Sequence, residues 1–196
     1  MRRILKRHDW SRGTGAAGAV TSPAESGDWS RSDVPAGDVP GGEIAADEWR
    51  VPGEDATDAD SLIVPLAELR KDTEGWLARS GRLGVRLAPA ENVESLADVL
   101  PRLTLVAVEF PNVGDGRGFS YGRLLRDRLG FKGELRAVGG GVKQDKIFLL
   151  ARCGFDSFEL PPGEKEDEAA AALRRYDVVY QPAEPIEGIK RQRFFA

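Results

Sequence analysis

The chain has 196 residues, of which 41% are hydrophobic and 31% charged, and this composition suits one globular domain with a genuine core. A formal net charge of -4 argues against a dedicated nucleic-acid-binding protein, which normally presents a basic face. With one cysteine, Cys153, and one histidine, His8, an intramolecular disulfide, a thiolate-rich metal site and a His-based relay are excluded from the folded domain. We therefore expect no metal site, and the composition identifies no cofactor.

No apolar run approaches the roughly 18 residues that a membrane-spanning helix needs. The basic start at residues 1–7 is not followed by the apolar segment of a signal peptide, and acidic residues come soon after it. We therefore expect a cytoplasmic protein without a membrane-spanning segment.

Residues 1–60 are predicted to form a mostly disordered leader. From residue 11 onward this stretch is dominated by Gly, Ser, Pro, Ala and acidic residues, which bury too little apolar surface to offset the entropy lost on ordering. Trp10, Trp29 and Trp49 are the exceptions. We expect such single tryptophans to dock on the domain as local anchors rather than to bind ligands.

From residue 61 onward, short apolar runs alternate with helical periodicity. The pattern predicts, in chain order, strand 62–64, helix 66–80, strand 84–87, helix 93–100, strand 103–108, helix 121–129, strand 133–138, helix 142–153, strand 157–160, helix 164–176 and strand 178–180. This alternation predicts an α/β domain over residues 61–182 with a parallel sheet, followed by a tail at 183–196. A flavodoxin-like sheet and an incomplete (βα) barrel both fit.

Two of the predicted helices end in the same way, with a glycine followed by a phenylalanine. Gly130 and Gly154 suit the left-handed position that stops a helix, and Phe131 and Phe155 can fold back onto the last turn.

Two glycine-rich segments follow predicted strands, where ligands gather in parallel α/β sheets. In the first, Gly116 and Gly118 leave N–H groups accessible at the start of a helix, and Arg117 and Ser120 add donors that suit an anion. The spacing matches neither a dinucleotide-binding nor a P-loop fingerprint, so a plain glycine-rich turn is the alternative. The second segment, residues 139–141, is interpreted as a flexible connection, because three glycines are costly to order.

Several charged or reactive residues near these loops have a functional and a structural interpretation. Glu109 closes an apolar strand and is a candidate catalytic acid or base, or else the ion-pair partner of an arginine. Arg123 and Arg136 belong to a basic group that suits an anion or an acidic partner, or else pairs with Asp127 and Glu134. Cys153 falls at a helix end that disfavours a thiolate, and we expect a packed, inert thiol.

Four ordered motifs resemble the bacterial family called domain of unknown function 934. They are DGRGFS at 115–120, RLLR at 123–126, GFKGELRAVG at 130–139 and ARCGFD at 151–156, within a resemblance that covers roughly residues 61–181. The family usually has an acidic residue soon after Arg-Ala-Val-Gly, where this chain has Gly140 and Gly141. The resemblance implies a loosely labelled oxidoreductase whose gene lies beside those of assimilatory sulfite reductase.

The leading hypothesis from this resemblance is an accessory protein of assimilatory sulfite reduction. It would bind sulfite reductase or a small anion of that pathway through Arg117, Ser120, Arg123 and Arg136. The first alternative is a small α/β enzyme that acts on a phosphorylated or sulfated metabolite with Glu109 as acid or base. A flavin-dependent oxidoreductase is the second.

Overall fold

The computed structural model describes residues 3–6, 43–53, 56–173, 178–179 and 190–191. Within these ranges the main sheet has seven strands: β1 (Arg3–Lys6), β2 (Glu43–Ala46), β3 (Leu62–Pro65), β4 (Leu83–Leu87), β5 (Leu105–Glu109), β6 (Glu134–Val138) and β7 (Ser157–Leu160). The helical elements are α1 (Leu66–Lys71), α2 (Thr73–Ala78), the 3-10 turns η2 (Val93–Leu96) and η3 (Leu100–Arg102), α3 (Arg117–Arg123), the π-helical η4 (Leu124–Arg128), α4 (Gln144–Arg152) and α5 (Glu166–Ala172). β8 (Val178–Val179) and β9 (Lys190–Arg191) pair in a separate small sheet. None of the helices in the described ranges has the length and apolar character needed to cross a membrane.

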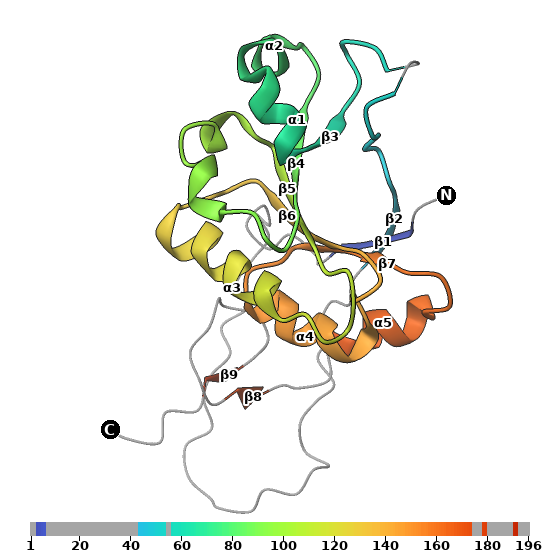
Figure 1. Cartoon of the computed structure of the whole chain (residues 1–196). Helices are drawn as coiled ribbons and strands as arrows, with labels where there is room; N and C mark the ends of the chain where they lie inside the picture. The colour runs from blue at the N-terminus through green and yellow to red at the C-terminus, as the bar shows by residue number, and fades with distance from the viewer. Residues whose placement is uncertain (1–2, 7–42, 54–55, 174–177, 180–189, 192–196) are drawn as a thin grey trace, which may run out of the picture.

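The strands lie in the order β2-β1-β7-β6-β5-β4-β3 (Figure 1). The five strands from β3 to β7 are parallel and follow one another in chain order, whereas β1 is antiparallel to both β7 and β2. The α/β class is confirmed. The predicted parallel sheet is present from β3 to β7, but the whole sheet is mixed, because β1 comes from the predicted leader and adds to β7 in the opposite direction.

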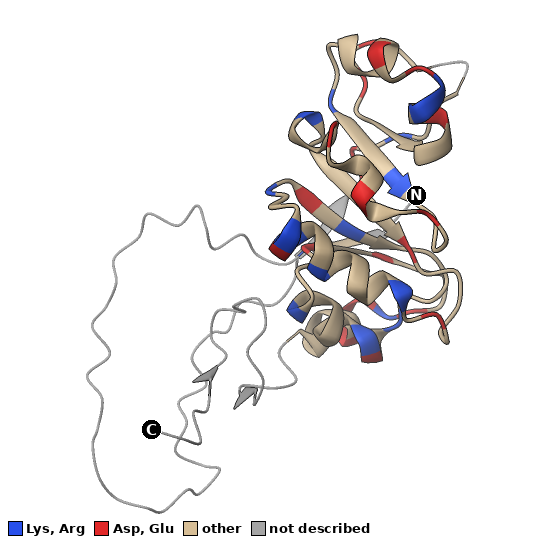
Figure 2. Cartoon of the chain, turned by 60° about the vertical axis from the view of Figure 1, so that its left-hand side comes forward, with Lys and Arg blue, Asp and Glu red and all other residues tan. Residues whose placement is uncertain are grey.

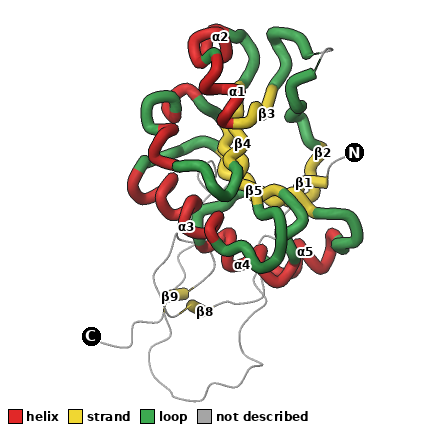
Figure 3. The backbone as a smooth tube through the Cα atoms, in the orientation of Figure 1, coloured by secondary structure: helices red, strands yellow, loops and turns green. Residues whose placement is uncertain are grey.

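The two faces of the sheet are covered by different parts of the chain. Val106 and Val108 of β5 belong to the large core cluster, which also holds apolar residues of α1, α4, α5 and η4. Ala107, between them, belongs to a second cluster. Right-handed crossovers between strands laid down in chain order place every helix on one side, as Figures 1 and 3 show for α3, α4 and α5. We call the other side the helix-free face.

Parts of the predicted leader belong to the domain. Ile4 and Leu5 of β1 are fully buried, and Leu5 joins the core under the helices. Trp49 is also buried, which confirms its expected role as an anchor; Trp10, Trp29 and most of the tail at 183–196 lie outside the described residues. These short apolar segments escaped the sequence analysis because composition was averaged over a long polar stretch.

The segment after β2, residues 47–50, crosses the helix-free face and is called the strap below. Trp49 packs there with Ile63, Leu105, Ala107 and Val138. Beyond it, the Arg50 N–H donates to the Ser61 carbonyl (2.9 Å), and the Ile63 N–H donates to the Arg50 carbonyl (2.8 Å). The strap thus connects β2 at one end of the sheet with β3 at the other, along the right-hand side of Figure 3. Burial of an indole contributes on the order of 5 kcal/mol relative to its exposure.

The helix ends agree with the sequence at two positions. Gly130 and Gly154 have φ of 65° and 96°, which confirms the left-handed stops. The N–H groups of Phe131 and Phe155 donate back to Leu125 and Leu150, and both rings are buried. The predicted helix 66–80 is instead two helices, because the Asp72 side chain accepts the Gly75 N–H and starts α2.

The two glycine-rich loops pack against each other at the carboxyl edge of the sheet. The Gly141 N–H donates to the Phe110 carbonyl (2.8 Å), and a Cβ on Gly139, whose φ is 101°, would lie 2.6 Å from that same oxygen. A Cβ on Gly141 would overlap the Asn112 carbonyl oxygen. The second loop is thus a close backbone contact rather than a flexible connection, because these glycines let the two chains approach.

Replacement of Gly141 by alanine should therefore destabilise the domain. We expect Gly141→Ala to lower the free energy of unfolding by about 2 kcal/mol, since the added methyl forces the loops apart. Gly140→Ala is the matched control, because a Cβ there would lie no nearer than 3.4 Å to Pro111, and its effect should stay within about 0.5 kcal/mol. Urea denaturation of the three proteins measures both values. Equal losses in the two variants would contradict the packed arrangement.

Candidate functional site

Arg86 and Glu109 form an ion pair on the helix-free face at the carboxyl ends of β4 and β5. Arg86 Nη2 lies 2.9 Å from Glu109 Oε1, and Arg86 Nε donates to Oε2 (3.2 Å). The two side chains remain 45% and 26% exposed, so a ligand can reach both. Glu109 therefore has the arginine partner that its structural interpretation requires, and it also lies where ligands bind in parallel α/β sheets.

The candidate residues of the first loop lie at the start of α3. Arg117 holds Asp115 through Nε and Nη2 (3.1 and 2.7 Å), and its hydrogen bonds keep the pKa of that carboxyl below the usual range. Ser120 is exposed on α3, and Gly116 faces open space. A Cβ on Gly118 would overlap the Phe110 ring, so this glycine lets α3 pack closely on the end of β5.

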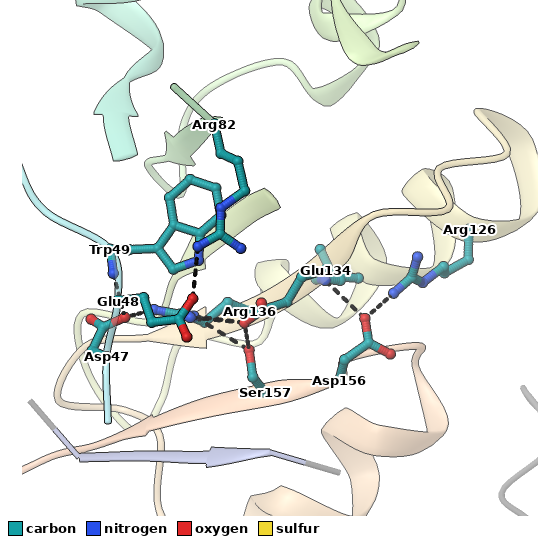
Figure 4. Close-up of polar contacts among 10 residues, drawn as sticks. Asp47, Glu48, Trp49, Arg82, Arg126, Glu134, Arg136, Asp156 and Ser157 are labelled. Carbon is teal, nitrogen blue, oxygen red and sulfur yellow. Dashed lines mark hydrogen bonds and ion pairs between the residues drawn. The ribbon is translucent and has the colours of Figure 1, made fainter. Parts of the chain in front are cut away.

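Arg136 occupies a different place from the other predicted anion-binding residues. It projects from the middle of β6 onto the helix-free face and is only 1% exposed (Figure 4). Its Nη1 donates to Asp47 Oδ1 (2.8 Å), its Nη2 to Glu134 Oε1 (2.8 Å), and its Nε to Glu134 Oε1 and Ser157 Oγ (3.0 and 3.3 Å). Arg117, Ser120 and Arg123 lie on α3, across the sheet. The structure therefore does not bring the four predicted residues together.

The remaining arginines of the basic group make contacts within the domain. Arg123 pairs with Asp127 (2.7 Å), and Arg128 pairs with Glu94 (2.6 Å). Arg126 donates to the carbonyls of Phe131, Gly133 and Gly154. It also pairs with Asp156 (Figure 4), and together these contacts connect η4 with the starts of β6 and β7. The pairs with Asp127 and Glu134 are those that the structural interpretation expected. Figure 2 shows Lys and Arg positions and Asp and Glu positions spread through the same elements of the ribbon.

The helix that follows the second loop already carries a carboxylate at its N-terminus. Glu164 accepts the Gln144 N–H (3.1 Å) and the Lys143 ammonium (3.0 Å). The hydrogen bond from Lys143, and then that from Gln144, lower the pKa of Glu164 below its usual 4.5. Glu164 therefore fills the position at the start of α4 where an external anion would otherwise bind.

Cys153 is half-buried at the C-terminal end of α4, and burial raises the pKa of its thiol despite the nearby charges of Arg123 and Arg152. A raised pKa agrees with the expected inert thiol, although burial is the main cause. Among the described residues there is no group of three or more His, Cys, Asp and Glu side chains placed to hold a metal ion.

The family model described as "Bacterial protein of unknown function (DUF934)" matches residues 84–187, more than half of the chain. The chain belongs to this family. No curated protein matches the sequence.

The part of this DUF934 chain that the family model matches holds most of the candidate groups. It includes Arg86, Glu109, the first loop and Arg136, whereas Asp47 and Trp49 of the strap precede it. Sequence reasoning missed Arg86 and Asp47. The sequence could have indicated Arg86, because this residue interrupts the apolar residues of a strand whose neighbour ends in Glu109. No sequence pattern could have indicated the contact of Asp47 with Arg136, since 89 positions separate the two residues.

The carboxylate of Glu164 should make the stability of this DUF934 chain depend on pH. Its pKa is lower in the folded state, so its contribution is present above about pH 4.5, the usual value, and is lost as the pH falls through the lower folded value. We therefore expect Glu164→Gln to destabilise the protein at pH 7, with a difference from wild type that shrinks below pH 4.5. Thermal unfolding between pH 3 and 7 measures this. Glu168→Gln, at an exposed pair with Lys165, serves as the control, and a Glu164 difference that stays constant with pH would contradict the assignment.

Proposed function

We propose that the protein is an accessory protein of assimilatory sulfite reduction, which docks on sulfite reductase rather than carrying out the chemistry itself. The assignment to sulfite reduction is based on the resemblance of the four sequence motifs to this family. The docking role is supported by a surface beside the first loop, defined by Val113, Arg117, Lys146 and Leu149.

Two half-exposed apolar side chains carry this proposal. Val113 and Leu149 are 51% and 47% exposed, and Val51 is the one other large apolar residue of the described part that is exposed to this degree. Lys146 joins the two, because its ammonium donates to the Val113 carbonyl and it precedes Leu149 by one turn of α4. Apolar side chains bordered by cations are typical of a protein interface, where the apolar part is buried and the charges steer the partner.

The cations of this surface are held in place by neighbouring groups. Arg117 is fixed by its two hydrogen bonds to Asp115, and Lys146 adds a favourable charge near the same carboxylate. Ordering these long side chains before association reduces the entropy that binding must overcome. Gly116 and Ser120 lie within the same stretch of chain. The proposed surface therefore includes most of the first-loop residues of the anion site predicted from the sequence, but it does not include Arg136.

The sheet topology agrees with a binding role on the outer side. Parallel strands in chain order are what an incomplete (βα) barrel requires, and a flavodoxin-like order would place the first strand inside the sheet. In the barrel interpretation, the helices form the outer surface and the helix-free face forms the interior. The proposed docking surface then lies on the outside.

Affinity purification tests the docking proposal. We expect the tagged protein, purified from native cells grown on sulfate as sole sulfur source, to retain sulfite reductase, and Leu149→Asp to reduce this retention about tenfold or more. Val51→Asp is the matched control, because it places the same charge at an equally exposed valine elsewhere, and its retention should equal that of wild type. High salt should weaken the wild-type complex. Undiminished retention by Leu149→Asp would contradict the surface, and failure to retain sulfite reductase would contradict the pathway.

A second candidate function is supported by the partly exposed Arg86–Glu109 pair. A phosphorylated or sulfated metabolite would bind the Arg86 guanidinium, and Glu109 would then be close enough to act as acid or base. The pair lies at the carboxyl ends of adjacent parallel strands, where enzymes of this class place their chemistry.

Glu109→Gln separates this enzyme from the docking protein. If Arg86 binds the substrate anion, removal of the neighbouring negative charge should tighten sulfate or phosphate binding several-fold while turnover is lost. Titration of the Arg86 Nε resonance with each anion measures binding. Glu94→Gln, at an exposed pair with Arg128, is the control and should change neither quantity. Unchanged anion binding in Glu109→Gln, with no turnover by wild type, would rule the enzyme out.

A further inference from the structure

The strap holds the helix-free face through contacts from a few consecutive residues. Asp47 reaches Arg136, Trp49 covers the apolar strip, and Arg50 exchanges two backbone hydrogen bonds with the segment that begins β3. The pairings between neighbours from β3 to β7, in contrast, run strand to strand and do not involve the strap. Loss of the strap contacts therefore leaves the parallel part of the sheet paired.

The buried arginine keeps a carboxylate partner when the strap is removed. Of its three side-chain partners, Asp47 belongs to the strap, whereas Glu134 and Ser157 lie on β6 and β7 (Figure 4). Glu134 Oε1 accepts from both Nε and Nη2 of Arg136 and also from the Ser157 hydroxyl (2.5 Å). After departure of Asp47, Arg136 still pairs with Glu134, which lowers the cost of breaking the Asp47–Arg136 ion pair.

Trp49 is seated on the sheet by shape rather than by polar contacts. A Cβ on Gly84 would lie 3.2 Å from the indole, so the absence of a side chain at Gly84 lets the ring pack directly on β4. On the same ring, the Arg82 guanidinium lies 5.1 Å from the centroid and also pairs with Glu48 (2.7 Å), an exposed contact (Figure 4). The indole can therefore leave without stranding a buried polar group of the sheet.

We propose that the strap opens as a unit while the parallel sheet stays folded, with the Asp47–Arg136 pair as its latch. Opening exposes the guanidinium of Arg136, the hydroxyl of Ser157 and the apolar strip of Leu105, Ala107 and Val138 on one face. The strap is thus a lid over a face that carries a guanidinium–carboxylate pair beside an apolar strip. Such local opening requires less free energy than global unfolding, because a small part of the structure loses its contacts.

Amide hydrogen exchange of the whole protein under native conditions tests this lid. The Ile63 N–H, which donates to Arg50, reports the strap, whereas the N–H groups of Phe110 and Glu134, which donate to Val138 and Thr104, report the middle of the sheet. In wild type, we expect Ile63 to exchange faster than the other two, at a rate that changes little with low urea concentrations. Equal protection of all three amides, with the same urea dependence, would overturn the proposal without any variant.

Two substitutions then assign the latch. Asp47→Asn removes the charge that meets Arg136 and should speed Ile63 exchange roughly tenfold to a hundredfold while leaving Phe110 and Glu134 unchanged. Glu48→Gln, one residue away, breaks the exposed pair with Arg82 and should change Ile63 exchange less than twofold. Acceleration of all three amides together in Asp47→Asn, or of none, would overturn the assignment of Asp47 as the latch.

Discussion

The fold depends on the handedness of the connections between parallel strands. Because the strands from β3 to β7 follow one another in chain order, right-handed crossovers place the helices that connect them on the same side of the sheet. The second face still carries apolar residues, among them Leu105 and Val138, and must be covered by other means. The strap covers these apolar residues with the indole of Trp49. An element that looks peripheral in the sequence is therefore needed to complete the core.

The buried arginine follows from the same constraint. Arg136 projects from β6 onto the face without helices, where a charged side chain persists only if partners surround it. Glu134 and Ser157 supply two of them from the sheet itself, and Asp47 supplies the third from the strap. Residues that sequence reasoning assigned to one anion site thus divide between two faces. Arg117 and Ser120 lie outside, while Arg136 helps to close the interior.

Local patterns in the sequence predicted most of the elements, because periodicity and helix-stop residues depend on near neighbours. The strand at 157–160 and the stops at Gly130 and Gly154 are examples. Contacts between distant segments were not predictable in this way. Nothing near Asp47 indicates that it meets Arg136, and the polar composition around Trp49 concealed that its segment is ordered. The glycines at 139–141 misled for a related reason, because a close backbone approach and a flexible loop have the same composition.

The division of the molecule into two faces also separates the functional proposals. The docking surface around Leu149 lies on α4, on the helix-covered side, and its side chains are already exposed. The lid covers the opposite face, where Trp49 and Arg136 are buried. The sheet that lies between them is held by its own strand pairings, so a change at one face reaches the other only through a rigid layer. A partner bound at α4 would therefore leave the strap free to open, and the Arg86–Glu109 pair, at the open carboxyl edge, remains accessible in either state.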